Sequence, residues 1–431
     1  MPKFYIENYG CQMNLSESDS LKNLILSEGY SIVDSPMNAD FVIINTCSVR
    51  KTAEDRIYGR LGYYRGLKQE KNPFVKVVVM GCMAQNVGEE LKKDFSDVVV
   101  AVWGTYNKQK LLDLINENSY DIVYKEMIEY KFMEATPETK FPFKAYLPIS
   151  HGCNNFCSYC IVPYVRGREI NRDSNEIIEN VKRLLDKGVL EITLLGQNVN
   201  SYNDGRLNFP ELLDVIANKT EIKRLTFLTS HPKDFSREIV EVIKSNKNIL
   251  KYIHLPLQSG NNRILGLMNR KYTVEKYLMD IEMAKEIEGV VLSTDVIVGF
   301  PGETEKEFLD TIELMRSVKF NEAYMYYYNP RPNVKANELE GELPLSEKKR
   351  RLAYLIDVQN QIKVELSKTY LNNEYEVLFE ALSKKNRREV FGRTHNNLIV
   401  FTEGDKNIIG TIKKFKVNSI FNNVLKGDII Y

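Results

Sequence analysis

Three cysteines fall within eight residues near the middle of the chain, in the stretch CNNFCSYC at positions 153–160. We call this stretch the central loop. Thiolates are the usual ligands of iron–sulfur clusters, and a [4Fe-4S] cube that only carries electrons has four of them. No fourth cysteine lies nearby, since the next one upstream is Cys82. The spacing therefore predicts a cube with one iron left open to bind a small molecule.

The C-x-x-x-C-x-x-C spacing has a known use. The open iron chelates the amino and carboxylate groups of S-adenosylmethionine, and one electron from the cube then splits the sulfonium to give a 5′-deoxyadenosyl radical, chemistry that belongs to the cofactors. The alternative is a structural zinc site with His151 as its fourth ligand. Structural zinc sites usually separate two ligand pairs by a longer insert, so we favour the cluster.

Composition limits the kind of protein and its compartment. A chain of 431 residues is long enough for about three domains, and a net charge of +1 restricts any nucleic-acid surface to a local patch. No apolar run approaches the ~18 residues of a membrane span, and the N-terminus lacks the apolar core of a signal peptide. We therefore expect a cytoplasmic protein without membrane contact. In that reducing compartment its six cysteines are expected to bind metal or act in catalysis.

Residues 1–125 alternate between short β-rich runs and helical patterns. The β-rich runs are residues 4–9, 41–45, 75–80 and 98–102. A helical pattern covers residues 16–28, with Ser16 as a possible cap and Gly29 as a terminator. This alternation predicts a doubly wound parallel sheet of the flavodoxin type.

The remaining three cysteines, Cys11, Cys47 and Cys82, each follow one of the first three predicted strands. We call them the N-terminal triplet. Doubly wound sheets bind ligands at the carboxyl ends of their strands, so cysteines far apart in the chain can meet there. Gly10 and Gly81 would allow the backbone to approach closely. The alternative is three buried structural thiols. We favour a second three-thiolate cluster, again with one open iron.

A second alternating series occupies residues 145–330, after residues 129–144, which lack periodicity and predict a linker. Its strands are predicted at residues 145–150, 192–195, 225–229, 252–255, 291–298 and 323–327. Six βα units are too few for a full eight-stranded barrel and predict an open, partial (βα)6 barrel of the TIM type. Active sites in such barrels gather on the loops after the strands, and the central loop follows the first strand.

Other residues on that edge are candidates for contact with S-adenosylmethionine, because they lie in or near loops that end a predicted strand. They are Tyr159, Arg166, Gly196, Gln197, Asn198, Gln258, Asp295 and Gly299. His231 and His254 are either proton donors or structural histidines, and we favour the structural role because nothing places either beside a reacting group. The tyrosines of residues 324–328 either stack on a base or pack within their strand, the commoner case.

The C-terminal part changes character. Residues 331–369 form a charged connector with a helix from about residue 346, and residues 370–431 contain five short β-patterned runs that predict a small β-barrel. Ten Lys and Arg residues against seven acids give this last segment a net charge of +3. Small barrels with basic loops and aromatics commonly hold single-stranded RNA, and a plain packing domain is the alternative.

Motifs throughout the chain resemble those of the radical S-adenosylmethionine methylthiotransferases. They are YGCQMN, INTCSVR, VMGC, GCNNFCSYCIVPYVRGRE, LLGQNVNSY, HLPLQSGNN and VIVGFPGET, and residues 370–431 resemble a TRAM domain. The resemblance implies two [4Fe-4S] clusters. One is held by Cys153, Cys157 and Cys160 and cuts S-adenosylmethionine; the other is held by the N-terminal triplet and handles sulfur. One S-adenosylmethionine would methylate that sulfur, and a second would yield the radical that activates a C–H position.

The residues around the first cysteines resemble the branch of that family that acts on tRNA. That branch modifies C2 of N6-isopentenyl-adenosine beside the anticodon. The alternatives are threonylcarbamoyl-adenosine in tRNA, a ribosomal protein side chain, and, from another class, a non-catalytic iron–sulfur protein that binds RNA. The implied partners are tRNA, an electron donor and a sulfur or iron–sulfur donor. Asn171 departs from the family pattern, in which Ser is common.

Overall fold

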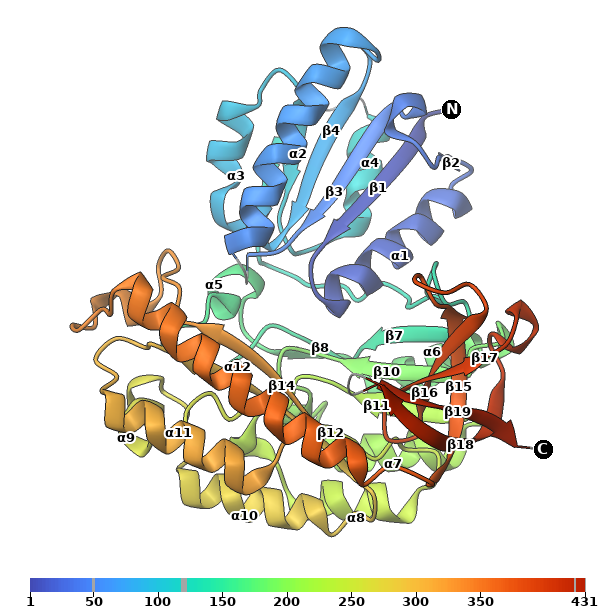
Figure 1. The fold of residues 1–431 in the computed structure, drawn as a ribbon. Coiled ribbons are helices and arrows are strands. Elements are labelled where there is room, and N and C mark those ends of the chain that lie inside the picture. The colour runs from blue at the N-terminus through green and yellow to red at the C-terminus, as the bar shows by residue number, and fades with distance from the viewer. Residues whose placement is uncertain (49–50, 118–121, 422–423, 431) are drawn as a thin grey trace.

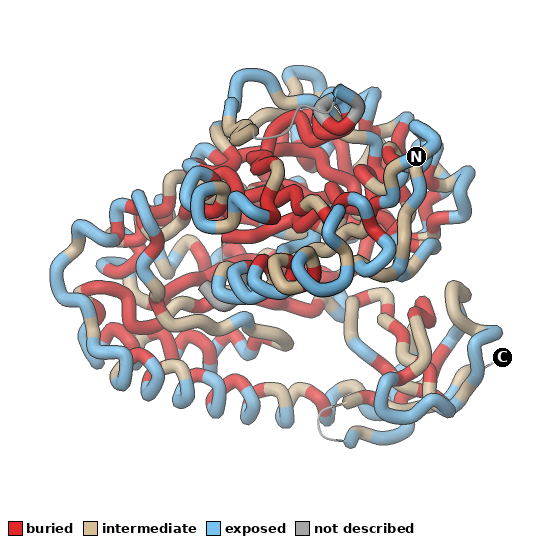
Figure 2. The backbone as a smooth tube through the Cα atoms, turned by 90° about the horizontal axis from the view of Figure 1, so that it is seen from above, coloured by how far each residue is buried: buried red, intermediate tan, exposed pale blue. Residues whose placement is uncertain are grey.

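The computed structural model describes residues 1–48, 51–117, 122–421 and 424–430. The last two residues of the INTCSVR motif and Tyr431 lie outside these ranges. Three units follow one another along the chain (Figure 1): an N-terminal sheet flanked by helices, a partial barrel beneath it, and a small barrel at the side of the partial barrel. Figure 2 shows buried residues concentrated along the strands and exposed residues on the outer turns of the helices.

The N-terminal unit is a six-stranded, fully parallel sheet in the order β2-β1-β3-β4-β5-β6. Its strands are β1 (Lys3–Tyr9), β2 (Ser31–Ile32), β3 (Phe41–Thr46), β4 (Lys76–Gly81), β5 (Val99–Trp103) and β6 (Ile122–Tyr124). Its helices are α1 (Gln12–Ser27), α2 (Lys51–Glu70), α3 (Cys82–Asp94) and α4 (Leu111–Asn116). The predicted flavodoxin-type order is confirmed, and the sequence patterns missed only the short strands β2 and β6 of this sheet.

Alternation along the central strands explains why helices cover both faces of this sheet. Successive side chains of a strand point to opposite faces. In β3, Val42 and Ile44 join one core with residues of α2 and α3. Phe41 and Ile43 join the other core with residues of α1 and α4. The sheet is therefore buried on both faces, as a parallel sheet requires.

The predicted start of the first helix was wrong. Helix α1 begins at Gln12, and Cys11 is its N-cap residue. Ser16 lies inside the helix, buried, and its hydroxyl donates to the carbonyl oxygen of Tyr146 at 3.0 Å, in the neighbouring unit. The end was predicted correctly, because Gly29 follows the helix with a φ of +83°.

The central unit is the predicted open barrel. Its parallel strands are β7 (Lys144–Pro148), β10 (Glu191–Leu195), β11 (Arg224–Phe227), β12 (Tyr252–His254), β13 (Val291–Val298) and β14 (Glu322–Tyr327). They form the sheets β11-β10-β7 and β12-β13-β14, which a bridge between Leu225 and Ile249 connects. Ser150, predicted as the last residue of the first strand, instead belongs to β8 (Ser150–His151), which pairs with β9 (Ile170–Asn171).

Helices surround the outside of this partial barrel. They are α6 (Ser174–Asp186), α7 (Phe209–Lys219), α8 (Arg237–Ser245), α10 (Val274–Lys285) and α11 (Glu305–Val318), and they share one core with the strands. Two shorter helices, α5 (Val162–Arg166) and α9 (Asn262–Leu267), follow loops at the edge facing the N-terminal unit. Among the described residues, no helix is both long and apolar enough to cross a membrane.

Residues 129–144, predicted to be a linker, are irregular but packed against the central unit. Asn180 of α6 accepts from the backbone N–H of Ala135 at 2.9 Å and donates to its carbonyl oxygen at 3.1 Å. The ring of Tyr130 stacks on His151 with the ring centroids 3.7 Å apart. On the other side, Ser20 of α1 donates to the carbonyl oxygen of Glu134 at 2.8 Å, so this segment contacts both of the first two units.

The charged helix α12 (Leu345–Lys368) crosses the partial barrel and leads to the C-terminal barrel (Figure 1). That barrel is closed, in the order β15-β16-β17-β19-β18, as the sequence predicts. Its strands are β15 (Glu374–Leu382), β16 (Glu389–Thr394), β17 (Ile399–Glu403), β18 (Ile412–Phe421) and β19 (Val424–Ile430). Its interior is filled by Val377, Phe379 and Phe415 among others.

Buried charges attach the C-terminal barrel to the starts of β7, β10 and β11. Lys144 Nζ lies 2.8 Å from Glu191 Oε1 and 2.9 Å from Glu380 Oε1. Arg224 lies 2.7 Å from Glu191 and donates from Nη2 to the carbonyl oxygen of Thr394 at 2.9 Å. We call these five residues the barrel joint. Its two cations each link a strand of the central unit to the C-terminal barrel.

Candidate active site

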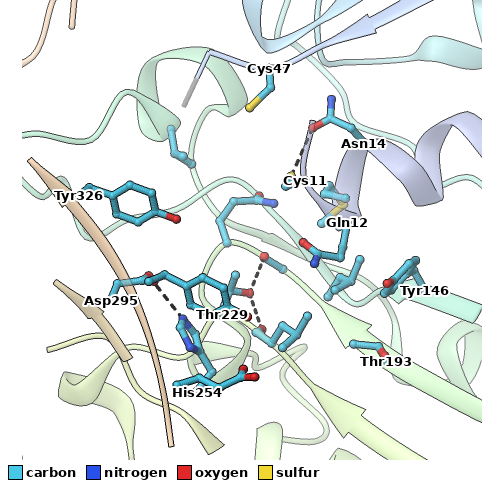
Figure 3. Close-up of a pocket in the computed structure, with 18 of the residues that line it drawn as sticks. Cys11, Gln12, Asn14, Cys47, Tyr146, Thr193, Thr229, His254, Asp295 and Tyr326 are labelled. Carbon is cyan, nitrogen blue, oxygen red and sulfur yellow. Dashed lines mark hydrogen bonds and ion pairs between the residues drawn. The ribbon is translucent and has the colours of Figure 1, made fainter. Parts of the chain in front are cut away.

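One cavity of about 1070 Å³ is lined by all three units (Figure 3). The N-terminal triplet lines one part of it, together with Cys160 of the central loop. Inward-facing side chains of the partial barrel line the middle, and Glu380 and Arg393 of the C-terminal barrel line another part. The fold thus brings the two separate groups of cysteines to a common space.

Each cysteine of the N-terminal triplet stands between the end of a strand and the beginning of a helix. Cys11 is the N-cap of α1, and Cys82 is the first residue of α3. Cys47 follows β3 directly; it and Cys82 are buried, whereas Cys11 is exposed. The positive end of a helix dipole favours a thiolate, so these positions suit cysteines that bind a metal.

Asparagine side chains connect the three strand ends. Asn14 accepts a hydrogen bond from the Cys11 thiol at 3.3 Å and donates to Asn45 Oδ1 at 2.9 Å. Asn45 in turn donates to the carbonyl oxygen of Asn14 at 2.9 Å. Thr46 donates to the carbonyl oxygen of Met80 at 2.7 Å, which links β3 to β4. This buried network holds the loops of the triplet in register.

The close approach of these loops requires glycine at position 81, as predicted. Gly81 has a φ of +97°, which L side chains rarely adopt. A Cβ atom there would lie 2.6 Å from both Asn45 Oδ1 and the carbonyl oxygen of Thr46. A larger residue at this position would therefore separate Cys82 from the strand end that carries Cys47.

The central loop is held by hydrogen bonds to its neighbours. Cys153 N–H donates to the carbonyl oxygen of Gly167 at 3.1 Å, and Ser158 Oγ donates to that of Leu267 at 2.7 Å. Burial raises the pKa of the Cys160 thiol to about 12, and the nearby Cys157 adds to this effect. Thiolates crowded in a buried loop require a positively charged partner, which the irons of a cluster provide.

The donor set fits a cube better than a single metal ion. Each thiolate of a [4Fe-4S] cube binds a different iron, so the cysteines must surround a space rather than meet at a point. Within residues 1–48, 51–117, 122–421 and 424–430, no three His, Cys, Asp or Glu side chains are arranged to hold a single ion. His151, the fourth ligand in the zinc alternative, is fully buried between the rings of Tyr106 and Tyr130.

Comparison with known proteins identifies the family. The chain is 41% identical to the tRNA-2-methylthio-N(6)-dimethylallyladenosine synthase of Lachnoclostridium phytofermentans, over 96% of this chain and 92% of that protein. It is 38% identical to the synthase of Treponema denticola, over 99% of both chains. The chain belongs to this synthase family.

Family models and solved structures agree with this membership. Residues 3–103 match the Uncharacterized protein family UPF0004, residues 147–315 the Radical SAM superfamily and residues 368–430 the TRAM domain. The structure resembles that of the radical S-adenosylmethionine methyltransferase TsrM from Kitasatospora setae, with a TM-score of 0.57 and 13% identity over 78% of this chain and 74% of that chain. At this identity the likeness concerns the fold alone.

Within this synthase fold, most of the predicted S-adenosylmethionine contacts line the cavity. Those that do are Tyr159, Arg166, Gly196, Gln197, Gln258 and Asp295. Gln258 Oε1 is buried and has no hydrogen-bond partner among the described residues, so it is free to bind a ligand. Asn198 and Gly299 are not among the lining residues: Asn198 donates to Asp234 at 2.7 Å, and Gly299 donates its N–H to Glu303 at 2.6 Å. The roles of all eight residues remain predictions.

The two candidate histidines differ in the synthase structure. His231 accepts the backbone N–H of Lys233 at 3.1 Å, which is a structural role. His254 lines the cavity (Figure 3), with Nε2 3.4 Å from Asp295 Oδ2 and Nδ1 2.8 Å from Ser293 Oγ. The tyrosines of residues 324–328 also line the cavity, while Tyr327 packs against the central core and Tyr328 is buried in a hydrophobic cluster; base stacking by these rings stays a prediction.

Arg270 is a residue of this site that the sequence patterns missed. Its Nη1 lies 3.3 Å from Cys157 Sγ and 3.4 Å from the Tyr159 hydroxyl, and its Nη2 donates to the carbonyl oxygen of Pro256 at 3.1 Å. A charged donor stabilises a thiolate more strongly than a neutral one. Arg270 is 113 positions from Cys157 in the chain, and no local motif marks it.

Proposed function

We propose that this chain methylthiolates C2 of N6-isopentenyl-adenosine beside the anticodon of tRNA. The observation that carries the proposal is one cavity lined by the whole N-terminal triplet and by Cys160 of the central loop. The near full-length identity to tRNA-2-methylthio-N(6)-dimethylallyladenosine synthases supports this nucleoside. A threonylcarbamoyl-adenosine or a ribosomal protein substrate has no comparable support from these relatives.

The proposal assigns one [4Fe-4S] cluster to the central loop and one to the N-terminal triplet, with S-adenosylmethionine at the open iron of the first. When bound, these groups supply the radical, the sulfur and the methyl group. The protein holds both sites at one cavity, so that a substrate carbon between them can reach each in turn. Holding the reacting groups at a fixed separation is the main contribution that a protein makes to such a reaction.

The side chains in the middle of the cavity suit an adenine base. Aromatic rings stack on bases of any sequence, and Tyr324 and Tyr326 line this region. His254 and Asp295 offer a donor and an acceptor to the edge of the base. Hydrogen abstraction from carbon requires no general base, and none of these groups is assigned that role.

The proposal names tRNA as the macromolecular partner, with an electron donor and a sulfur or iron–sulfur donor supplied by other proteins. The basic C-terminal barrel is the part proposed to bind the RNA backbone. A protein that modifies tRNA meets its substrate in the cytoplasm, and the proposal places the chain there.

Mass spectrometry of tRNA nucleosides tests the proposal. A strain without this gene is expected to lack 2-methylthio-N6-isopentenyl-adenosine and to accumulate N6-isopentenyl-adenosine. The wild-type gene should restore the methylthio nucleoside, and a Cys157→Ala gene should not. Loss of a methylthiolated threonylcarbamoyl-adenosine instead would contradict the assigned nucleoside. If the purified protein formed no 5′-deoxyadenosine from S-adenosylmethionine and a reductant, the non-catalytic alternative would stand.

A further inference from the structure

Arg166 crosses from the central unit into the N-terminal unit. It ends α5, the short helix after the central loop, and α5 lies between the two units (Figure 1). Its Nη1 lies 2.9 Å from Glu17 Oε1, and Glu17 is on α1, the helix that Cys11 caps. The side chain of Arg166 is 3% exposed. A guanidinium from one cysteine-bearing unit is thus buried beside the cysteines of the other.

Backbone contacts fix the position of α5 against the N-terminal unit. Thr105 Oγ1 donates to the carbonyl oxygen of Val165 at 2.6 Å, and the Tyr106 hydroxyl donates to that of Arg166 at 3.3 Å. Arg166 lines the cavity with Cys160 and with the whole N-terminal triplet. These contacts fix the backbone of Arg166, and the ion pair with Glu17 fixes the end of its side chain.

Among the described residues, the buried positive charges around Arg166 outnumber the carboxylates that pair with them. Lys108 and Arg166 are both buried, and both pair with the single carboxylate of Glu17. His151 Nδ1 lies 3.4 Å from Arg166 Nη1, and an imidazole ring supplies no negative charge to balance the guanidinium. Two buried cations that share one anion leave an excess of positive charge, which is costly unless another anion lies nearby.

The thiolates of the N-terminal triplet can supply the negative charge that balances Arg166 and Lys108. Burial acts to lower the pKa of Arg166, but Cys82, Glu17 and Cys11 outweigh it and keep that pKa well above the usual value. Three thiolates on an iron–sulfur cube carry a net negative charge, and this charge increases when the cube accepts an electron. A fixed positive charge beside the cube favours that electron.

We propose that Arg166 is a positioning residue for the cluster of the N-terminal triplet: held by Glu17, its guanidinium balances the charge of that cluster and raises its reduction potential. The assignment rests on the proposed function for the presence of the cluster, but not on the identity of the substrate. The position of Arg166 after the central loop suggests a contact with S-adenosylmethionine. The proposal assigns it instead to the sulfur-handling cluster of the N-terminal triplet.

A redox titration followed by electron paramagnetic resonance tests the proposal. The three cysteines of the central loop are replaced by Ala, so that only the cluster of the N-terminal triplet contributes a signal. In this background Arg166→Gln should disfavour reduction at least tenfold, a shift of about 59 mV to more negative potential for a one-electron couple. Glu17→Gln removes the opposing charge and should shift the potential in the positive direction.

The opposite signs of the potential shifts expected for Arg166→Gln and Glu17→Gln distinguish an electrostatic role from a structural one. Damage to the contact between the units would move both variants in the same direction, and that result would overturn the proposal. Arg166→Lys should recover most of the wild-type potential because it keeps the charge. Arg168→Gln is the matched control, because Arg168 is exposed and lies two positions along the chain; its shift should stay below about twofold.

A variant that fails to assemble the cluster also gives an interpretable result. If Arg166→Gln retains no iron, the Glu17→Gln titration decides, and a negative or absent shift refutes the proposal. Loss of the cluster from both variants would assign these residues to folding alone. A failure of the proposed function can be told apart from a failure of this inference. In that case the wild-type protein would form no methylthiolated nucleoside, whatever the reduction potentials of the variants.

Discussion

Replacing Glu191 by Gln should release the C-terminal barrel from the central unit. Glu191 is 3% exposed and bonds both cations of the barrel joint, at 2.8 Å to Lys144 and 2.7 Å to Arg224. Without its charge, Lys144 retains Glu380, but Arg224 retains only the carbonyl oxygen of Thr394. Removing one partner of a buried ion pair typically costs about 3–5 kcal/mol.

The pKa of Glu191 gives a second value for the free energy that its carboxylate contributes to folding. Burial acts to raise this pKa, but Lys144 and Arg224 outweigh burial and lower it from 4.5 to about 2. At about 1.4 kcal/mol per unit, the ionised carboxylate contributes about 3 kcal/mol to the free energy of unfolding. Because the folded-state pKa is depressed, this contribution is complete above the ordinary pKa of 4.5. It is lost as the pH falls from about 4.5 towards 2.

Hydrogen–deuterium exchange of β15–β19 measures the release. A loss of about 3 kcal/mol should speed exchange of the protected barrel amides by about 150-fold at pH 7, if these amides open when the barrel detaches. The difference from wild type should be the same at pH 8 and pH 6. Glu241→Gln is the control: Glu241 is half-exposed and bonds Arg237 and Lys244 on the surface, so exchange should change less than about fivefold. Equal exchange rates in the two variants would refute the reasoning.

Three further predictions concern the clusters and the tRNA. Anaerobic reconstitution should give about eight irons per chain by iron assay, and Ala at the three central-loop cysteines should halve this number; an unchanged count would contradict the assignment. Cys47→Ala should still form 5′-deoxyadenosine but no methylthiolated nucleoside, whereas Cys157→Ala should form neither. Chromatography of both products from one reaction measures this. Full methylthiolation by Cys47→Ala would exclude the second cluster. Gln at the four exposed Lys and Arg of residues 384–388 should weaken tRNA binding and flatten its salt dependence by about 0.7 per lost phosphate contact; unchanged affinity would leave this loop without an RNA role.

The prediction about tRNA binding uses substitutions rather than deletion of the C-terminal barrel, because deletion would break the barrel joint. Deleting residues 370–431 would seem a direct test of RNA binding by the C-terminal barrel. The deletion would also expose Lys144, Glu191 and Arg224, which are buried against that barrel, and would open one end of the cavity. A lost activity would then report damage to the central unit. The exposed loop of residues 384–388 can be changed without touching the joint.

Local patterns predicted the fold well where neighbouring residues decide it. Strand β3 was placed within one residue, because its buried run FVII is continuously apolar. Strand β13 (VLSTDVIV) was placed equally well, because apolar residues mark both of its ends. The start of α1 was misplaced by four residues, because Ser16 looks like a cap when its distant partner, the carbonyl oxygen of Tyr146, is not visible. The short strands β2 and β6 carry too few residues to show a pattern.

The cysteines could be recognised because their chemistry depends on residue type and on short spacing. Three thiolates within eight residues must lie close together in any fold, and cysteines at successive strand ends converge in any doubly wound sheet. By contrast, Arg270 and Arg166 meet their partners across 113 and 149 positions of the chain. Their side chains are chemically identical to those of the other arginines of the chain, so no local pattern separates them.

The sequence by itself therefore determined which groups are proposed to do the chemistry: six thiolates in two sets of three, on a sheet and a partial barrel that local periodicity specifies. The tertiary structure alone decided that the N-terminal triplet and Cys160 of the central loop line one cavity, and which charges surround them. That arrangement depends on how three separately folded units dock. Docking is set by buried ion pairs such as Arg166 with Glu17 and Lys144 with Glu380, whose strength comes from exclusion of water and exists only once the units have met.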